Sequence, residues 1–333
     1  RVRRSAAGHR RSNRQSARPD RAGHSSGRTH WSIRLPPQSL AWACSPARRT
    51  PVRSPADTAA AAANAPKEKV SWGKMLGYKQ TWAFVLGKFM TDGIWWFLLF
   101  WLPTYVKQQF CYGLTKETTA SYVMISNFVV FGIAIIGSIY GGSIPMSFMN
   151  KGWETYKARM TAMLLIACAP LFLLSTQWMA TYGIVAAIGI ISIGGAAHQA
   201  WSANLFTTVS DMFPKKAVGT VTGIGAAAGG LGGVVLQQVA GRLEDYYRSI
   251  GVAQAKAQAL IQETAKIPLE KIKIDNLKEV VVNESAIEQA RQLISTNVSV
   301  AYGIMFTICA LSYLAAWFMM KALVPRHKPI TDL

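Results

Sequence analysis

Residues 82–106 read WAFVLGKFMTDGIWWFLLFWLPTYV, and only Lys88 and Asp92 in this stretch are charged. A transmembrane α-helix needs about 20 consecutive, predominantly apolar residues. Comparable stretches recur along the chain, and we predict membrane spans at 82–106, 120–142, 160–179, 182–206, 217–240 and 298–321. The connections between the first four are short. The sequence therefore predicts an all-α polytopic membrane protein with six helices in one bundle.

The composition of the 333-residue chain agrees with a location in the lipid bilayer. Half of the residues are hydrophobic, and 16% are charged, against roughly 25% in soluble domains. A soluble enzyme with one large core is therefore excluded. The four cysteines are isolated and show no CxxC spacing, so we expect neither a zinc site nor a disulfide framework. No cofactor and no metal are expected.

The net charge of +20 is divided between two unlike parts. Residues 1–66 hold 13 Arg, no Lys and two acids, whereas residues 67–333 hold 5 Arg and 18 Lys against 14 acids. The first part has no hydrophobic period, which predicts a disordered basic tail. A transit-like peptide, a nucleic-acid-binding tail and a non-native extension are the alternatives. We favour the last, and we expect no nucleic-acid partner.

The distribution of Lys and Arg among the short loops predicts the orientation of the bundle. One side collects twelve basic residues, whereas the opposite short loops hold only Lys107 and Lys116. We therefore expect both ends of the bundle in the cytoplasm, in a bacterial inner membrane. The expected organisation is a tail (1–66), five helices (67–241), an extracytoplasmic insert (242–296) and a last helix with a cytoplasmic C-terminus (297–333). In the insert, helical stretches at 252–266 and 284–294 should flank a short extended piece.

Ionisable residues inside the membrane are costly and are functional candidates by default. Lys88 and Asp92 are four residues apart and share one helix face. The fourth span contains His198, and counting from the cytoplasmic ends places these three residues within roughly 6 Å of depth. Further polar and aromatic side chains follow His198, namely Gln199, Trp201 and Asn204. The alternative is that Lys88 and Asp92 only neutralise each other within one helix.

Other intramembrane residues are weaker candidates. Trp95 and Trp96 lie one turn beyond Asp92 and could stack on the apolar face of a sugar, or belong to the outer aromatic belt. Asn127 is more easily explained by an interhelical hydrogen bond. Pro103 should end or bend the first span near its outer end.

The fifth span is rich in small residues that let helix backbones approach closely. The GxxxG spacings are formed by Gly219, Gly223, Gly225, Gly229 and Gly233. A dimerisation face is one interpretation. We favour close packing against a neighbouring helix that slides during gating.

Three segments resemble the second half of hexuronate transporters, which belong to the anion:cation symporter family of the major facilitator superfamily. They are LGKFMTDGIWWFLLFWLPTYV (86–106), GGSIPMSFMNKGWETYKARM (141–160) and AAHQAWSANLFTTVSDMFPKKAVGTVTGIGAAAGG (196–230). The resemblance extends over 67–333. The residues Gly141, Gly142, Lys151, Gly152, Ala158 and Arg159 resemble the cytoplasmic loop motif of the superfamily between its eighth and ninth helices.

The resemblance implies that the six spans are helices seven to twelve of a twelve-helix transporter with substrate bound between two halves. The first half, which holds most of the family's proton-coupling acids, is missing, so transport by this part alone is not expected. The implied function is alternating-access import of sugar acids such as glucuronate or galacturonate with protons or sodium. A carrier of another organic anion and a non-transporting membrane remnant are the alternatives. A membrane enzyme using His198 is disfavoured, because His198 has no second ligand or nucleophile.

Overall fold

The computed structural model describes residues 71–261 and 271–332. The tail predicted over 1–66 lies outside these residues. The elements, in chain order, are α2 (Trp72–Leu76), α3 (Lys79–Phe110), α4 (Lys116–Gly141), α5 (Ser143–Asn150), α6 (Thr155–Cys168), the 3₁₀ helix η2 (Ala169–Ser175), α7 (Thr176–Ala180), α8 (Ile184–Met212), α9 (Lys215–Ala257), the 3₁₀ helix η4 (Ile274–Glu279) and α10 (Glu284–Leu323). The all-α fold class is confirmed.

Among the described residues, six helical segments are long and apolar enough to cross a membrane, as predicted. They are Lys79–Phe110, Lys116–Asn150, Thr155–Ala180, Ile184–Met212, Lys215–Ala257 and Glu284–Leu323. Local chemistry explains several boundaries. The Thr115 side chain accepts a hydrogen bond from the Thr118 N–H at the start of α4, and Asn283 caps α10 in the same way. Gly183, with a φ of 110°, makes the turn into α8.

Two prolines lie inside the predicted spans and act differently. Pro103 was expected to end or bend the first span, and it does not end it, since α3 continues through it to Phe110. Neighbouring helices can satisfy the backbone groups that a proline frees inside a membrane. In the third span, Pro170 lies at the start of η2, where the α-helix tightens into a 3₁₀ helix.

The helices of the fifth and sixth spans continue beyond the predicted ends of those spans, 240 and 298, since α9 runs to Ala257 and α10 begins at Glu284. The helix predicted at 284–294 is the first part of α10, and the start of the one predicted at 252–266 belongs to α9. The piece between them, predicted to be extended, contains η4. The two extensions pack tightly, since a Cβ at Gly251 would lie 2.6 Å from the Ile294 Cα. The buried Arg248 guanidinium donates to the Ile272 carbonyl at 3.0 Å. The connection between the spans is therefore a distal lobe of two helix ends closed by 271–282.

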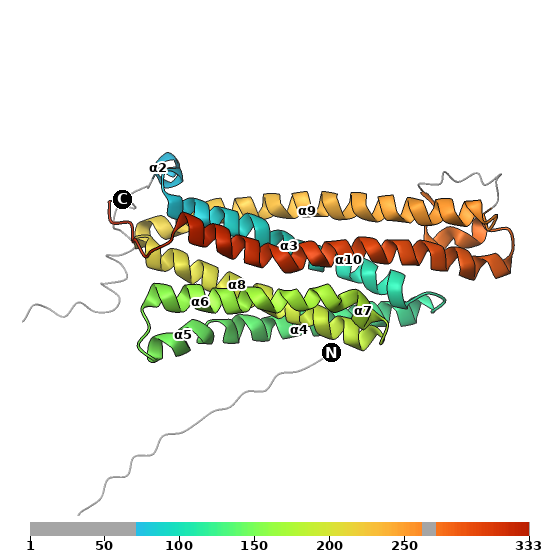
Figure 1. Cartoon of the computed structure of the whole chain (residues 1–333), viewed down its shortest axis with the longest axis horizontal. Coiled ribbons are helices and arrows are strands. Elements are labelled where there is room, and N and C mark those ends of the chain that lie inside the picture. The colour runs from blue at the N-terminus through green and yellow to red at the C-terminus, as the bar shows by residue number, and fades with distance from the viewer. Residues whose placement is uncertain (1–70, 262–270, 333) are drawn as a thin grey trace, which may run out of the picture. The chain divides into compact units, whose positions relative to one another are not determined.

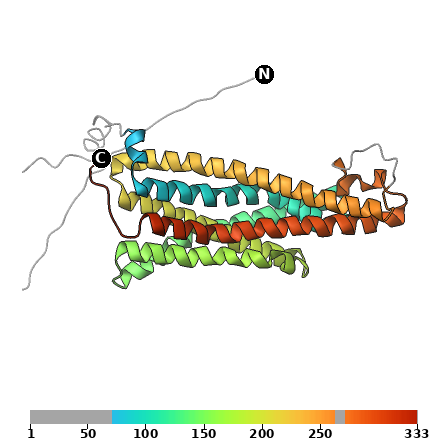
Figure 2. The same cartoon turned by 45° about the horizontal axis from the view of Figure 1, so that its top comes forward.

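Helices α9, α3 and α10 pack together in the bundle, and α8 packs against α3, α4 and α6 (Figures 1 and 2). In addition, α10 contacts α6 and α3 contacts α4. Two pairs approach very closely at glycines. A Cβ at Gly232 of α9 would lie 1.9 Å from the Phe89 carbonyl oxygen of α3, and one at Gly137 of α4 would lie 2.2 Å from the Ala196 carbonyl oxygen of α8. These contacts bring α9 against α3 and α4 against α8, and α3 and α8 carry most of the candidate site.

Large apolar side chains cover much of the outer surface of the bundle. The α4 helix is the most exposed span, with 17% of its most apolar window buried. Its exposed side chains include Met124, Ile125, Phe128, Ile135, Ile136 and Ile139. A soluble monomer rarely exposes so large an apolar patch, so this surface agrees with a lipid environment.

Candidate functional site

Lys88 and Asp92 form an ion pair in the middle of α3. The Lys88 Nζ lies 2.7 Å from the Asp92 Oδ2, and the two side chains are 6% and 18% exposed. The ammonium also lies 4.5 Å from the centre of the Phe206 ring on α8, a cation–π contact. The carboxylate lies against α9, where a Cβ at Gly229 would come within 2.3 Å of Oδ2. Glycine at 229 therefore makes room for the acid.

His198 of α8 is held by aromatic residues from two other helices. The Trp95 ring stacks on the imidazole with 5.1 Å between centroids and an interplanar angle of 16°. The His198 Nδ1 and the Tyr313 hydroxyl of α10 are 2.8 Å apart and share a hydrogen bond. Within the described part of the chain, Nε2 has no hydrogen-bond partner. The ring is thus fixed in orientation, with one nitrogen left for a further partner.

The register between α3 and α8 differs from the one predicted by counting from the helix ends. Because Lys88 contacts Phe206 and Trp95 contacts His198, His198 lies at the level of Trp95 rather than between Lys88 and Asp92. Seven residues of helix separate Lys88 from that level, about 10 Å at 1.5 Å per residue. The site is therefore two adjoining clusters along α3 and α8, instead of one layer about 6 Å deep.

The other predicted site residues lie in different surroundings. Trp96 faces α9, where a Cβ at Gly233 would lie 2.6 Å from its ring, and so it is not beside His198. Trp201 is fully buried against Tyr313. Gln199 is half-buried on the turn that follows His198.

The two asparagines serve the packing of the helices. The Asn204 Nδ2 donates to the Gly141 carbonyl of α4 and to the Ala200 carbonyl of its own helix, both at 2.8 Å. It therefore links α8 to α4 at the close contact of these helices. Asn127 was predicted to make an interhelical bond, but its amide donates to the Val123 carbonyl one turn earlier in α4.

The small residues of α9 divide into two groups. Gly225, Gly229 and Gly233 lie against Phe84, Asp92 and Trp96 of α3, as the packing interpretation requires. Gly219 and Gly223 have no atom within 4 Å of an added Cβ in the described structure. The first group of glycines on α9 therefore faces α3, the helix that carries the ion pair.

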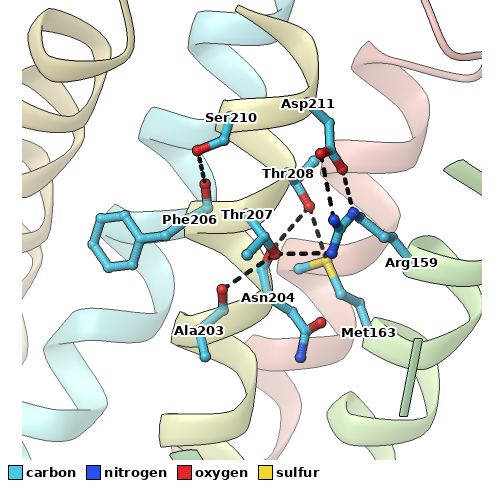
Figure 3. A network of polar contacts seen from close by, with 9 residues as sticks. All are labelled: Arg159, Met163, Ala203, Asn204, Phe206, Thr207, Thr208, Ser210 and Asp211. Atoms are coloured by element: carbon cyan, nitrogen blue, oxygen red, sulfur yellow. Dashed lines mark hydrogen bonds and ion pairs between the residues drawn. The ribbon is translucent and has the colours of Figure 1, made fainter. Parts of the chain in front are cut away.

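A second polar network joins α6 to α8 near the end of the bundle where α3 begins (Figure 3). The Arg159 guanidinium forms an ion pair with the Asp211 carboxylate, and its Nη1 donates to the Thr207 hydroxyl at 3.1 Å. The sequence motif included Arg159, but Asp211 was not predicted as its partner. Charge alone could have suggested it, since Asp211 is the only acid between residues 160 and 240. No comparable feature of the sequence marks Phe206 as the neighbour of Lys88 or Tyr313 as the partner of His198.

Tyr313→Phe is expected to lower the free energy of unfolding by about 1–3 kcal/mol, because a buried imidazole nitrogen loses its partner. The ring contact with Trp201, at 5.7 Å between centroids, is retained by Phe. Thermal unfolding of the purified protein in detergent measures the change. Tyr182→Phe, at an exposed position in the turn before α8, is the control and should leave stability unchanged. Equal stability of the two variants would contradict the hydrogen bond.

The described structure is that of an integral membrane protein, with a bundle of candidate spanning helices that encloses a charged pair and a buried histidine. The chain belongs to the Major Facilitator Superfamily, which matches residues 31–236.

Two curated relatives carry transporter names. The chain is 26% identical over 179 residues to the hexuronate transporter of Escherichia coli strain K12, covering 54% of this chain and 40% of that protein. It is 26% identical over 186 residues to the D-galactonate transporter of Escherichia coli O6:H1, covering 52% of this chain and 38% of that protein. The chain thus spans about two fifths of the length of these relatives. No solved structure matches it significantly.

Proposed function

We propose that the protein takes part in the import of sugar acids, hexuronates such as glucuronate and galacturonate, by alternating access. The supporting observation is the ion pair of Lys88 and Asp92 in the middle of a membrane helix beside a histidine with one free nitrogen. The superfamily and the names of the relatives agree with this substrate class. They also favour a transporter over an enzyme.

Recognition of a sugar acid needs a cation for its carboxylate and hydrogen-bonding groups for its hydroxyls. An ammonium has three donors, and Asp92 accepts one from Lys88. In our proposal the substrate carboxylate takes another donor. The His198 Nε2 and the half-buried Gln199 would face the hydroxyls, and the Trp95 edge would lie against the ring. Trp96, Trp201, Asn127 and Asn204 support the helices in this scheme.

We propose protons as the coupling ion because of the charge balance at the site. Lys88 and Asp92 together are neutral, so a substrate carboxylate beside them adds one uncompensated negative charge in a region where such charges are costly. A proton taken up by Asp92 restores neutrality and leaves the ammonium to the substrate. One proton would thus accompany each sugar acid. Sodium coupling is the alternative.

A complete transport path needs a second wall opposite this bundle. In transporters of this kind the substrate lies near the midplane between two repeats. We therefore propose that these six helices act with a second set of six, with both ends of the bundle in the cytoplasm of a bacterial inner membrane. The second candidate substrate is a linear sugar acid, which the D-galactonate relative favours.

Uptake of labelled glucuronate, galactonate and glucose by cells that express these six helices together with the second set of six tests the proposal. We expect uptake of the acids to increase as the external medium becomes more acidic, because protons drive it, and no uptake of glucose. Vector-only cells provide the background. Uptake of glucose at the rate of glucuronate would contradict the assignment to acids. Acid uptake that follows external sodium and not pH would contradict the role of Asp92.

A further inference from the structure

The residues after α10 form a strap that folds back over the end of the bundle. We call residues 324–332 the C-terminal strap. The Ile330 N–H donates to the Met212 carbonyl at the end of α8, and the Gln80 side chain of α3 donates to the Lys328 carbonyl, both at 2.9 Å. The Ile330 side chain is buried. The strap is therefore attached to both α8 and α3.

A cavity lies between this strap and the turn from α2 to α3. The end of the strap is held by Lys74, whose Nζ donates to the Asp332 carbonyl at 2.7 Å, and by the Tyr78 hydroxyl, which donates to the Asp332 carboxylate at 3.0 Å. This cavity is open to the surface, has a volume of about 670 Å³, and is lined by residues 77–80 and by most of the strap. This volume lies in the range of about 300–1,000 Å³ found for ligand sites.

The lining of the cavity is strongly basic. Lys79, Arg326 and Lys328 line it, and the Asp332 carboxylate is the one acid among the lining residues. Within residues 71–261 and 271–332, no side-chain ion pair or hydrogen bond engages these three cations. Three cations without partners around a hollow favour an anionic ligand.

The position of the cavity points to the bilayer as the source of that anion. The helix α3 begins at Lys79, three residues before the apolar stretch 82–106, so the cavity lies beside the start of the predicted span. The indole rings of Trp72, in the short helix before the cavity, and Trp82, on α3, are 63% and 42% exposed. Tryptophan favours the level of the lipid headgroups, and basic pockets at this depth bind anionic headgroups. We propose that the cavity binds the headgroup of an anionic phospholipid.

Native mass spectrometry of the purified full chain in detergent, titrated with phosphatidylglycerol or phosphatidylcholine, tests this site. One cation near an anionic membrane surface strengthens attraction about fivefold, so Lys79→Gln/Lys328→Gln should weaken phosphatidylglycerol binding about 25-fold. Binding of phosphatidylcholine should not change. Lys151→Gln/Lys215→Gln removes the same charge from exposed positions at the same end of the bundle, outside the cavity. This control should retain the affinity.

Several results would overturn the proposal. Equal weakening in the two double variants would indicate general attraction to a basic surface, and no weakening in either would exclude the cavity. Inorganic phosphate that displaces phosphatidylglycerol at equal concentration would assign the site to free phosphate instead of lipid. If Lys79→Gln/Lys328→Gln unfolds, Arg326→Gln on the exposed part of the strap must by itself weaken binding about fivefold. An unchanged affinity for that single variant would also overturn the proposal.

Discussion

In the complete twelve-helix transporter, Lys88→Ala is expected to reduce uptake of sugar acids by about tenfold to a hundredfold, since a hydrogen bond to a charged group contributes about 1.5–3 kcal/mol. The lost interaction joins an ammonium to the substrate carboxylate, so any uptake of a neutral analogue should change much less. The variant also leaves Asp92 without its partner, and breaking such a buried pair costs about 3–5 kcal/mol. Expression should therefore fall as well. Lys107→Ala, an exposed lysine on the same helix, is the control.

A second variant separates binding from structure. Asp92→Asn in the Lys88→Ala background removes the stranded charge, so expression should recover. Because Asp92 also takes up the coupling proton in our proposal, the readout is binding of glucuronate to the purified transporter, with Asp92→Asn alone as the reference. If Lys88 contacts the substrate, binding stays weak in the double variant. Binding equal to that of Asp92→Asn alone would show that the ion pair is only structural. Recognition would then rest on His198 and Gln199. Quantitative immunoblotting measures the expression of each variant.

Gly232→Ala is expected to disrupt the contact of α9 with α3. The added Cβ would lie 1.9 Å from the Phe89 carbonyl oxygen, and a backbone atom cannot move aside as a flexible side chain can. Overpacking of this kind costs about 1–3 kcal/mol, occasionally more, which outweighs the gain of about 1 kcal/mol for Ala over Gly in a helix. We expect a net loss of about 1–2 kcal/mol in the free energy of unfolding, because the contact is with a backbone atom. Thermal unfolding in detergent measures it.

Gly230→Ala is the matched control, because it lies two residues earlier on the same helix and a Cβ there meets nothing within 4 Å. That variant should be neutral or more stable by up to about 1 kcal/mol. The test is the difference in stability between the Gly232→Ala and Gly230→Ala variants. Two variants of equal stability would show that α9 and α3 do not approach each other as closely as the structure has them.

The number and approximate position of the membrane spans could be predicted from the sequence. Partition into a bilayer depends on the summed hydropathy of about 20 consecutive residues, and this is a local property of stretches such as 82–106. Helix ends could not be predicted in the same way. Hydropathy falls after residue 240, but the helix of α9 continues to Ala257, because backbone hydrogen bonds and the contact between Gly251 and Ile294 do not depend on lipid.

Part of the candidate site could also be predicted, because that part depends on local properties of the sequence. The pairing of Lys88 with Asp92 follows from the helical period, and the cost of charge in the membrane marks these residues and His198. The helical period and the charges do not show which residues of other helices contact the ion pair and His198. Phe206 beneath Lys88 and Tyr313 beside His198 depend on the axial shift of three helices. That shift is set by backbone contacts such as that of Gly232 with Phe89, between residues far apart in the chain, and so only the tertiary structure decides it.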